Sequence, residues 1–120
     1  MPDERLYRSM LLDYYGDLLT PRQRECFELY YNEDLSLSEI AEQCGISRQG
    51  AWDNIRRASE AMERLEEKTG LLHRGLHMHD QLESLAGKLR VLEEQSQDEG
   101  MRQQLRAVLA AVVTLMNTEE

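Results

Sequence analysis

The chain contains little of what builds β-structure. Its 120 residues include one phenylalanine and one tryptophan, and β-branched side chains are sparse. Strands favour β-branched and aromatic residues, whereas Leu, Glu, Gln and Arg, which are abundant here, have high intrinsic helix propensity. Only two prolines and seven glycines are available to interrupt a helix. We therefore expect an all-α protein with almost no strand.

Basic residues are also in deficit. The chain has 14 Lys and Arg against 23 Asp and Glu, which gives a formal net charge of -9. A protein that coats nucleic acid through general electrostatics needs charge of the opposite sign. Any contact with nucleic acid must therefore come from a local basic patch.

Long apolar runs and cysteines are scarce as well. No run approaches the roughly 18 residues that a membrane span needs. The N-terminus does not follow the order of a secretory signal, in which a charged stretch precedes an apolar one. The two cysteines, Cys26 and Cys44, lie within apolar helical patterns, where a reduced thiol serves as a small core residue. We expect a cytoplasmic, soluble protein without a membrane partner.

Apolar residues recur three or four apart through most of the chain, which predicts a series of amphipathic helices. The first covers about 3–19, and its apolar face ends at Leu18. The second follows Thr20, whose hydroxyl and Gln23 form a capping box. The third begins at Ser36 and ends at Gly45, and the fourth covers 48–69.

The segment from the third to the fourth helix predicts a helix-turn-helix. Ser36 and Glu39 form a second capping box, Gly45 suits a left-handed turn, and Ser47 caps the helix that follows. This order sets two helices at a steep angle and presents the start of the second outward. The candidate nucleic-acid-binding residues are Ser47, Arg48, Gln49, Gly50, Trp52, Asp53, Arg56 and Arg57.

These candidate residues carry a local net charge of +2 in an acidic chain, since three arginines stand against Asp53. The alternative is that they form only the solvated face of an amphipathic helix. Trp52 has two interpretations, because it can pack on the first helix or stack on a base.

The C-terminal part predicts a helical hairpin, which divides the chain into a helix-turn-helix domain over 1–70 and a hairpin over 71–120. Two further apolar seams follow Gly70, separated by a polar loop. Two fully apolar stripes leave surface exposed, which favours a homodimer, although a self-contained monomeric bundle stays an alternative. The predicted dimerisation residues are Leu82, Leu85, Leu89, Leu92, Leu105, Leu109 and Val112.

The sequence shows no motif typical of a catalytic or metal-binding site. His73 and His77 would share a helix face, yet with His79 they fit a polar hinge better than a metal site. No glycine-rich phosphate loop is present, and no carboxylate pair has a histidine or apolar pocket beside it. We expect no catalytic residue, cofactor, metal or small-molecule substrate, and hence no enzyme.

Two resemblances refine this interpretation. The run 36–42 with 45–49 resembles region 4 of bacterial sigma factors, the helix-turn-helix that reads promoter DNA. Asn54 stands where that region is often apolar, so Ile55 is expected to take over the inward packing. A more specific resemblance, to the YlxM family of small bacterial proteins, rests on Leu19-Thr20, Gln23-Arg24, Leu29-Tyr30-Tyr31 and Ser47-Arg48-Gln49-Gly50-Ala51-Trp52-Asp53-Asn54-Ile55.

The resemblance to the YlxM family implies a helix-turn-helix regulatory protein with a role in the signal recognition particle pathway. The partners it implies are DNA, the RNA of the signal recognition particle, or the particle's GTPase. An alternative stays open, in which the chain is a protein or RNA adaptor of the particle and does not bind DNA.

Overall fold

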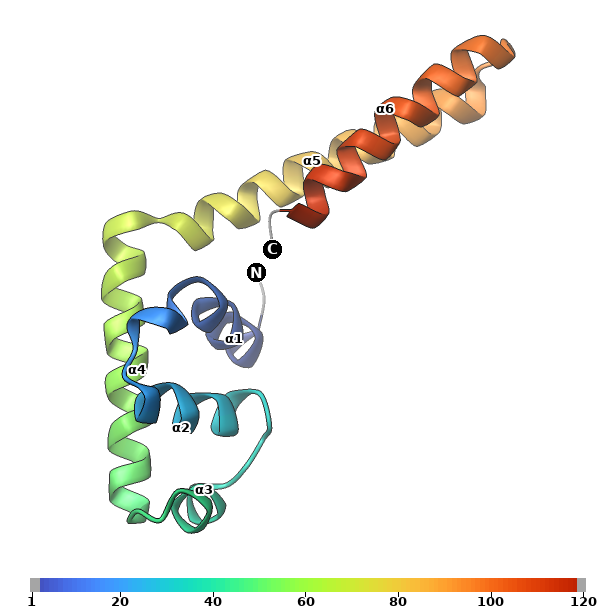
Figure 1. The fold of residues 1–120 in the computed structure, drawn as a ribbon. Helices are drawn as coiled ribbons and strands as arrows, with labels where there is room; N and C mark the ends of the chain where they lie inside the picture. The colour runs from blue at the N-terminus through green and yellow to red at the C-terminus, as the bar shows by residue number, and fades with distance from the viewer. Residues whose placement is uncertain (1–2, 119–120) are drawn as a thin grey trace. The chain divides into compact units, whose positions relative to one another are not determined.

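The computed structural model describes residues 3–118. Helices are the only regular secondary structure across this range, which confirms the all-α prediction (Figure 1). The chain divides into two compact units, Met1–Leu72 and His73–Glu120. The elements are α1 (Glu4–Tyr15), a short 3-10 helix (Gly16–Leu18), α2 (Pro21–Tyr31), α3 (Leu37–Cys44), α4 (Arg48–Thr69), α5 (Leu71–Gln95) and α6 (Glu99–Thr118).

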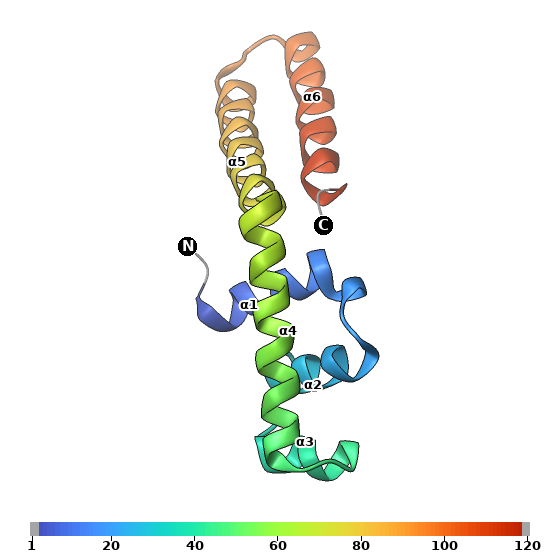
Figure 2. The same ribbon diagram turned by 90° about the vertical axis from the view of Figure 1, so that its left-hand side faces the viewer.

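The first unit is organised around α4. Helices α1, α2 and α3 each contact α4, and they lie at successive heights along it (Figure 2). All four helices contribute to the core, because Leu11, Phe27, Ile40 and Ile55 are each fully buried. The inward packing expected of Ile55 is thereby confirmed.

Helix starts in the first unit follow the sequence closely. Thr20 accepts a hydrogen bond from the backbone N–H of Gln23 and caps α2, as predicted. Ser36 does the same for Glu39 at the start of α3, and both capping boxes are complete. Such caps satisfy backbone N–H groups that have no partner within the helix.

The end of α1 differs from the prediction. The helix stops at Tyr15 and the chain tightens into a 3-10 turn, so it does not continue to residue 19. A 3-10 turn advances fewer residues per turn than an α-helix, which moves Leu18 off the apolar face. Leu18 is 70% exposed as a result, and its assignment to the inward face was wrong.

Polar contacts tie α1 to its neighbours. The Arg8 guanidinium lies 2.9 Å from Glu4 and 2.6 Å from Glu63 of α4. The Tyr15 hydroxyl lies 2.6 Å from the Glu66 carboxylate, and burial followed by this hydrogen bond raises the pKa of Tyr15. These contacts fix the register of α1 on α4.

Both cysteines are free thiols in the first unit. Cys26 is fully buried, and this burial raises the pKa of its thiol to about 11. Cys44 is half-buried and donates to the Glu25 carboxylate at 3.4 Å. A thiol that stays protonated is a poor nucleophile and metal ligand, which suits the predicted packing role of Cys26.

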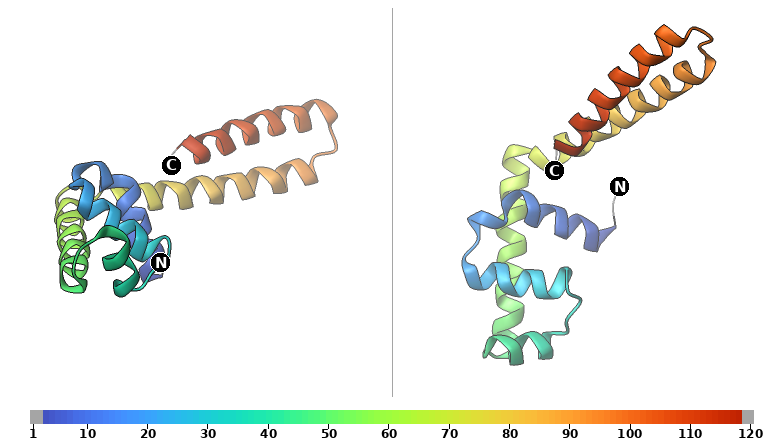
Figure 3. Two further views of the ribbon diagram at one scale, coloured as in Figure 1. Left: turned by 60° about the horizontal axis from the view of Figure 1, so that its bottom comes forward. Right: turned by 45° about the vertical axis from the view of Figure 1, so that its right-hand side comes forward.

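The second unit is the predicted helical hairpin, in which α5 and α6 run antiparallel (Figure 3). Its buried residues are Ala86, Leu89 and Val112. Partly buried side chains pack around them, namely Leu82, Leu105, Leu109 and Met116. A salt bridge between Glu93 of α5 and Arg106 of α6 closes one side.

The histidine-rich segment does not break the chain into two helices, because α5 runs continuously from Leu71 through His73, His77 and His79 to Gln95. Among residues 3–118, no cluster of three or more His, Cys, Asp or Glu side chains is placed to hold a metal ion.

Candidate nucleic-acid interface

The turn between α3 and α4 has the geometry that the sequence predicts. Gly45 takes the left-handed conformation at φ 67° and ψ 36°, and its N–H donates to the Ala41 carbonyl. The N–H of Ile46 donates to the same carbonyl at 3.0 Å, which ends α3. Ser47 then accepts from the N–H of Gly50 at 2.9 Å and starts α4.

Small and branched side chains hold α3 against the start of α4. Ala41 of α3 and Ala51 of α4 are buried, as are Ile40 and Ile55. Since an alanine leaves little side chain between two backbones, the helices approach closely at the turn. The N-terminal turns of α4 are therefore held by packing against α3.

Two of the eight predicted site residues serve the turn itself. The Ser47 hydroxyl is used as the cap of α4. A Cβ at Gly50 would come within 3.1 Å of this hydroxyl oxygen, so the absence of a side chain there leaves room for the cap. We assign Ser47 and Gly50 to positioning of α4.

The other six lie on the accessible surface of α4. Arg48, Gln49, Arg56 and Arg57 are exposed, and Asp53 is partly so. Trp52 is 40% exposed, so part of its indole is accessible to solvent and part is covered. Both interpretations of its ring, packing and stacking, stay predictions.

Neighbouring side chains on α4 partly neutralise one another. The Gln49 amide donates to Asp53 at 3.1 Å, and Arg56 lies 3.0 Å from Glu60 and 3.8 Å from Asp53. Exposed ion pairs of this kind contribute little free energy and exchange readily with solvent. Arg56 must therefore give up these partners to contact a ligand.

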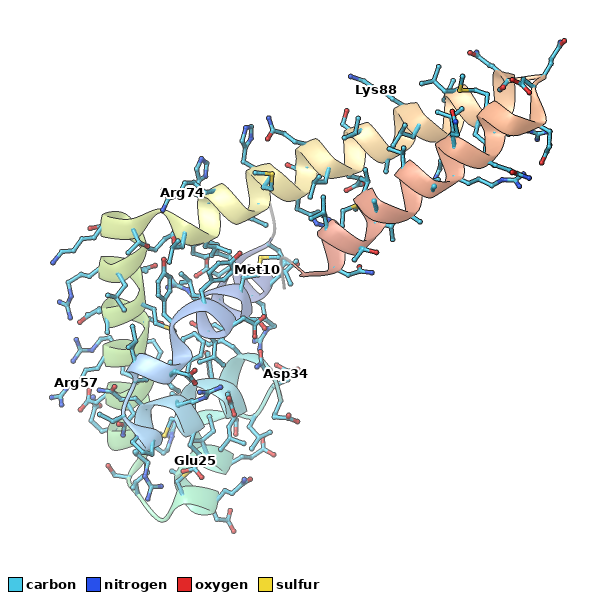
Figure 4. The ribbon with its side chains drawn as sticks, turned by 45° about the horizontal axis from the view of Figure 1, so that its top comes forward. Met10, Glu25, Asp34, Arg57, Arg74 and Lys88 are labelled. Carbon is cyan, nitrogen blue, oxygen red and sulfur yellow. The ribbon has the colours of Figure 1, made fainter. Side chains whose placement is uncertain are left out.

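Four basic side chains of α4 have no ion pair or side-chain hydrogen bond within the described range. By contrast, the arginines of α1 and α2 are all in salt bridges with nearby carboxylates. Arg57 projects away from α1 and α2 (Figure 4). The four are Arg48, Arg57, Arg64 and Lys68.

Arg48 and Arg57 lie on opposite flanks of α4. They are nine residues apart, which corresponds to two and a half helical turns and about 13 Å along the axis. Trp52, Arg56, Gln49 and Asp53 occupy the arc between them by the same geometry. We call these six residues the recognition face.

The sequence analysis missed Arg64 and Lys68. Their spacings of seven and eleven from Arg57 place them on the same flank of α4. That periodicity was visible in the sequence, but their lack of carboxylate partners was not. They lie about 24 and 30 Å from the start of α4, beyond the N-terminal turns with which a helix-turn-helix ordinarily contacts DNA.

The fold and this turn define a helix-turn-helix protein. Residues 2–99 match the family model described as "Putative helix-turn-helix protein, YlxM / p13 like". The chain belongs to this family, UPF0122, and the resemblance found in the sequence is confirmed. The description is that of a helix-turn-helix protein and names no enzyme type.

Relatives in several bacteria support the assignment. The UPF0122 protein of Thermoanaerobacter sp. (strain X514) is 42% identical over 98 residues, which cover 82% of this chain and 84% of the relative. The UPF0122 protein of Listeria innocua is 42% identical over 93 residues, covering 75% and 84%. That of Acetivibrio thermocellus is 53% identical over 74 residues, covering 61% and 63%.

The family match ends at the first residue of α6. It covers the first unit and α5, while the rest of α6 lies beyond it. Among the helices described, none combines the length and apolar character needed to cross a membrane.

Proposed function

We propose that this protein is a non-enzymatic, cytoplasmic regulator that binds nucleic acid through the recognition face of α4. The observation that carries the proposal is the pair of exposed arginines, Arg48 and Arg57, which have no carboxylate partner in residues 3–118. They flank a polar arc on a helix held at a helix-turn-helix angle.

The positions of the two arginines, on opposite flanks of α4, suit the two sides of a duplex groove. The major groove of B-DNA is about 12 Å wide, with a phosphate backbone on each side. When the start of α4 enters this groove, Arg48 reaches one backbone and Arg57 the other. Phosphate contacts of this kind fix register and orientation without reading sequence.

The arc between the arginines supplies the side chains that read bases. The Gln49 amide can donate to and accept from adenine, and Asp53 accepts from the amino group of cytosine. Arg56 reaches guanine once it leaves Glu60 and Asp53. Trp52 adds apolar contact for a thymine methyl group or a base.

The charge of the chain limits the affinity. Two phosphate contacts release few counterions, and the net charge of -9 repels the duplex elsewhere. We therefore expect weak binding to generic duplex that falls as salt rises, and tight binding only to a cognate sequence or shape.

The second candidate is an adaptor of the signal recognition particle that does not bind DNA. The mixed charge of the recognition face favours it, because Asp53 sits between the arginines and already accepts from Gln49. Such a face fits a protein surface or a folded RNA at least as well as a duplex. Both candidates place the protein in the particle's pathway, which rests on the resemblance to the YlxM family.

A pull-down with purified, tagged protein separates the candidates. The native protein, an Arg48→Ala/Arg57→Ala variant and an Arg64→Ala/Lys68→Ala control are each incubated with bacterial lysate, with and without nuclease. Both variants lose two positive charges from α4, so only the position of the charge differs. Circular dichroism checks that all three keep the same helix content.

The outcomes are distinct. A specific DNA fragment retained by the native protein and the control, but not by Arg48→Ala/Arg57→Ala, supports the regulator. Recovery of the particle's GTPase or RNA with the same dependence supports the adaptor. Equal recovery by all three proteins shows that the recognition face is not the site and overturns both candidates.

A further inference from the structure

The hairpin has a row of exposed apolar side chains on each of its helices. All six are between 45% and 52% exposed. Within each helix they are spaced seven residues apart, which repeats the same angular position every two turns. We call them the apolar face of the hairpin: Met78, Leu85 and Leu92 on α5, and Met101, Val108 and Leu115 on α6.

The two rows lie on the same side of the hairpin. On α5 the exposed row stands three positions beyond the inward positions Leu82 and Leu89, and on α6 it stands three beyond Leu105 and Val112. Each row is therefore displaced in the same rotational sense from its helix's inward face. In antiparallel helices the same rotational sense points to one common side.

The opposite side of the hairpin is charged. Glu83 and Arg90 of α5 follow the inward positions by one residue, and Arg106 of α6 does the same. Arg106 bridges to Glu93, and Glu83 lies 3.8 Å from His79. Next to the apolar face the outer positions are Gln81, Lys88, Gln104 and Ala111, so little charge borders it.

The core within one hairpin is small and leaves the side chains of the apolar face exposed. Its buried side chains are Ala86, Leu89 and Val112, one of which is only an alanine. Units this small ordinarily need oligomerisation, a metal or disulfides to bury enough apolar surface. The free cysteines lie in the other unit, and residues 3–118 contain no metal-binding cluster.

We propose that the apolar face binds the apolar face of a second copy of this chain, so that two hairpins form an antiparallel four-helix bundle. In a two-fold dimer the same patch of both copies forms the contact, so each row of one copy packs against a row with the same seven-residue spacing in the other copy. The connection at residues 96–98 sets the rows in three layers: Leu92 with Met101, Leu85 with Val108, and Met78 with Leu115.

The size of the face fits such a contact. Each row spans 14 residues, or about 21 Å of helix. Two helices lie side by side about 10 Å apart, so the face covers on the order of 200 Å² per copy, which is small for a stable dimer and fits a weak, reversible contact. Of the residues predicted for dimerisation, Leu85 and Leu92 belong to this face, whereas Leu82, Leu89, Leu105, Leu109 and Val112 pack within one hairpin.

Sedimentation equilibrium of the purified full chain tests the proposal. We expect a reversible monomer–dimer equilibrium for the native protein. The Leu85→Glu/Val108→Glu variant should raise the dissociation constant at least about 100-fold, because a carboxylate on the face would be buried without a partner. The helix content of this variant should equal that of the native protein at a concentration where the native protein is monomeric.

A matched control adds two carboxylates elsewhere on the same helices. Ser84 and Ala110 are exposed and point away from both the core and the apolar face, so Ser84→Glu/Ala110→Glu should dimerise like the native protein. A native protein that stays monomeric up to millimolar concentration overturns the proposal. Loss of dimer in the control to the same extent overturns it too, because charge alone would then explain the effect.

Discussion

The two units of this protein bury their helices to different extents. In Met1–Leu72, four helices share one core, and each supplies at least one fully buried side chain. In His73–Glu120, the helices are α5 and α6, which have 25 and 20 residues, and few side chains are buried between them. The first unit buries a core shared by its four helices, although single apolar side chains such as Leu18 stay exposed. The second leaves the apolar face of the hairpin exposed, and this is the face that we propose binds a second copy.

The largest expected effect is on the free energy of unfolding, and it differs between the cores of the two units. Ile55→Ala should lower the free energy of unfolding of the first unit by about 2–5 kcal/mol, because the cavity is enclosed on all sides. Leu89→Ala should cost less, since a thin core collapses more easily around a lost side chain. Trp52 is the one tryptophan of the chain, so its fluorescence in urea follows the first unit.

Under this account, Ile55→Ala moves the urea midpoint of Trp52 fluorescence, whereas Leu89→Ala leaves it unchanged. Circular dichroism at 222 nm detects unfolding of both units. Equal shifts of the fluorescence midpoint for the two variants would show that the two units unfold as one.

Two glycine substitutions should change the free energy of unfolding less, and in opposite directions in the two units. Gly45→Ala should destabilise the first unit by about 1 kcal/mol, since its left-handed conformation is strained for a residue with a Cβ. Gly87 lies inside α5 with open space around it. Gly87→Ala should therefore stabilise the second unit by about 1 kcal/mol through helix propensity.

Thermal unfolding followed by circular dichroism measures both glycine variants. A stabilising Gly45→Ala would show that the turn between α3 and α4 is not left-handed. A destabilising Gly87→Ala would show that the space around Gly87 is not open, contrary to the geometry described.

The smallest expected effect is a pH dependence at the start of α3. The backbone N–H of Ser36 donates to Glu39 and, followed by the Ser36 side chain, lowers the pKa of Glu39. The carboxylate therefore stabilises the folded state above its unfolded pKa of about 4.3, and this contribution is lost as pH falls through the lower folded value.

The amide chemical shift of Ser36, followed by NMR during an acid titration, reports this capping bond. We expect a midpoint below that of an unstructured glutamate. In Glu39→Gln the side chain still accepts the bond but does not titrate, so the shift should stay flat. A midpoint at or above about 4.3 would contradict the assigned capping bond.

Local features of the fold were predictable from sequence. The caps at Thr20, Ser36 and Ser47 depend on side chains within three residues of the amides they satisfy. Leu18 was misplaced because a periodic pattern does not show where a helix tightens into a 3-10 turn. Ala86 was missed in the hairpin core, because an alanine carries little hydrophobic signal.

The candidate site was predictable in position but not in charge. The turn residues located the exposed start of α4, and the structure places Arg48, Gln49, Trp52 and Arg57 on its surface. The pairing of Arg56 with Glu60 follows a spacing of four that is visible in the sequence. That Arg48 and Arg57 lack such partners depends on how the other helices pack.

The salt dependence of binding to a short DNA duplex reports whether Arg48 and Arg57 contact phosphates. Fluorescence anisotropy gives the binding constant from low to moderate salt for the native protein, Arg48→Ala/Arg57→Ala and Arg64→Ala/Lys68→Ala. With two phosphate contacts per copy, the slope of log K against log salt should be about -2 per bound copy, and each lost contact should reduce its magnitude by about one. We predict a slope near zero for Arg48→Ala/Arg57→Ala and an unchanged slope for Arg64→Ala/Lys68→Ala; the reverse order would contradict the assignment of the recognition face.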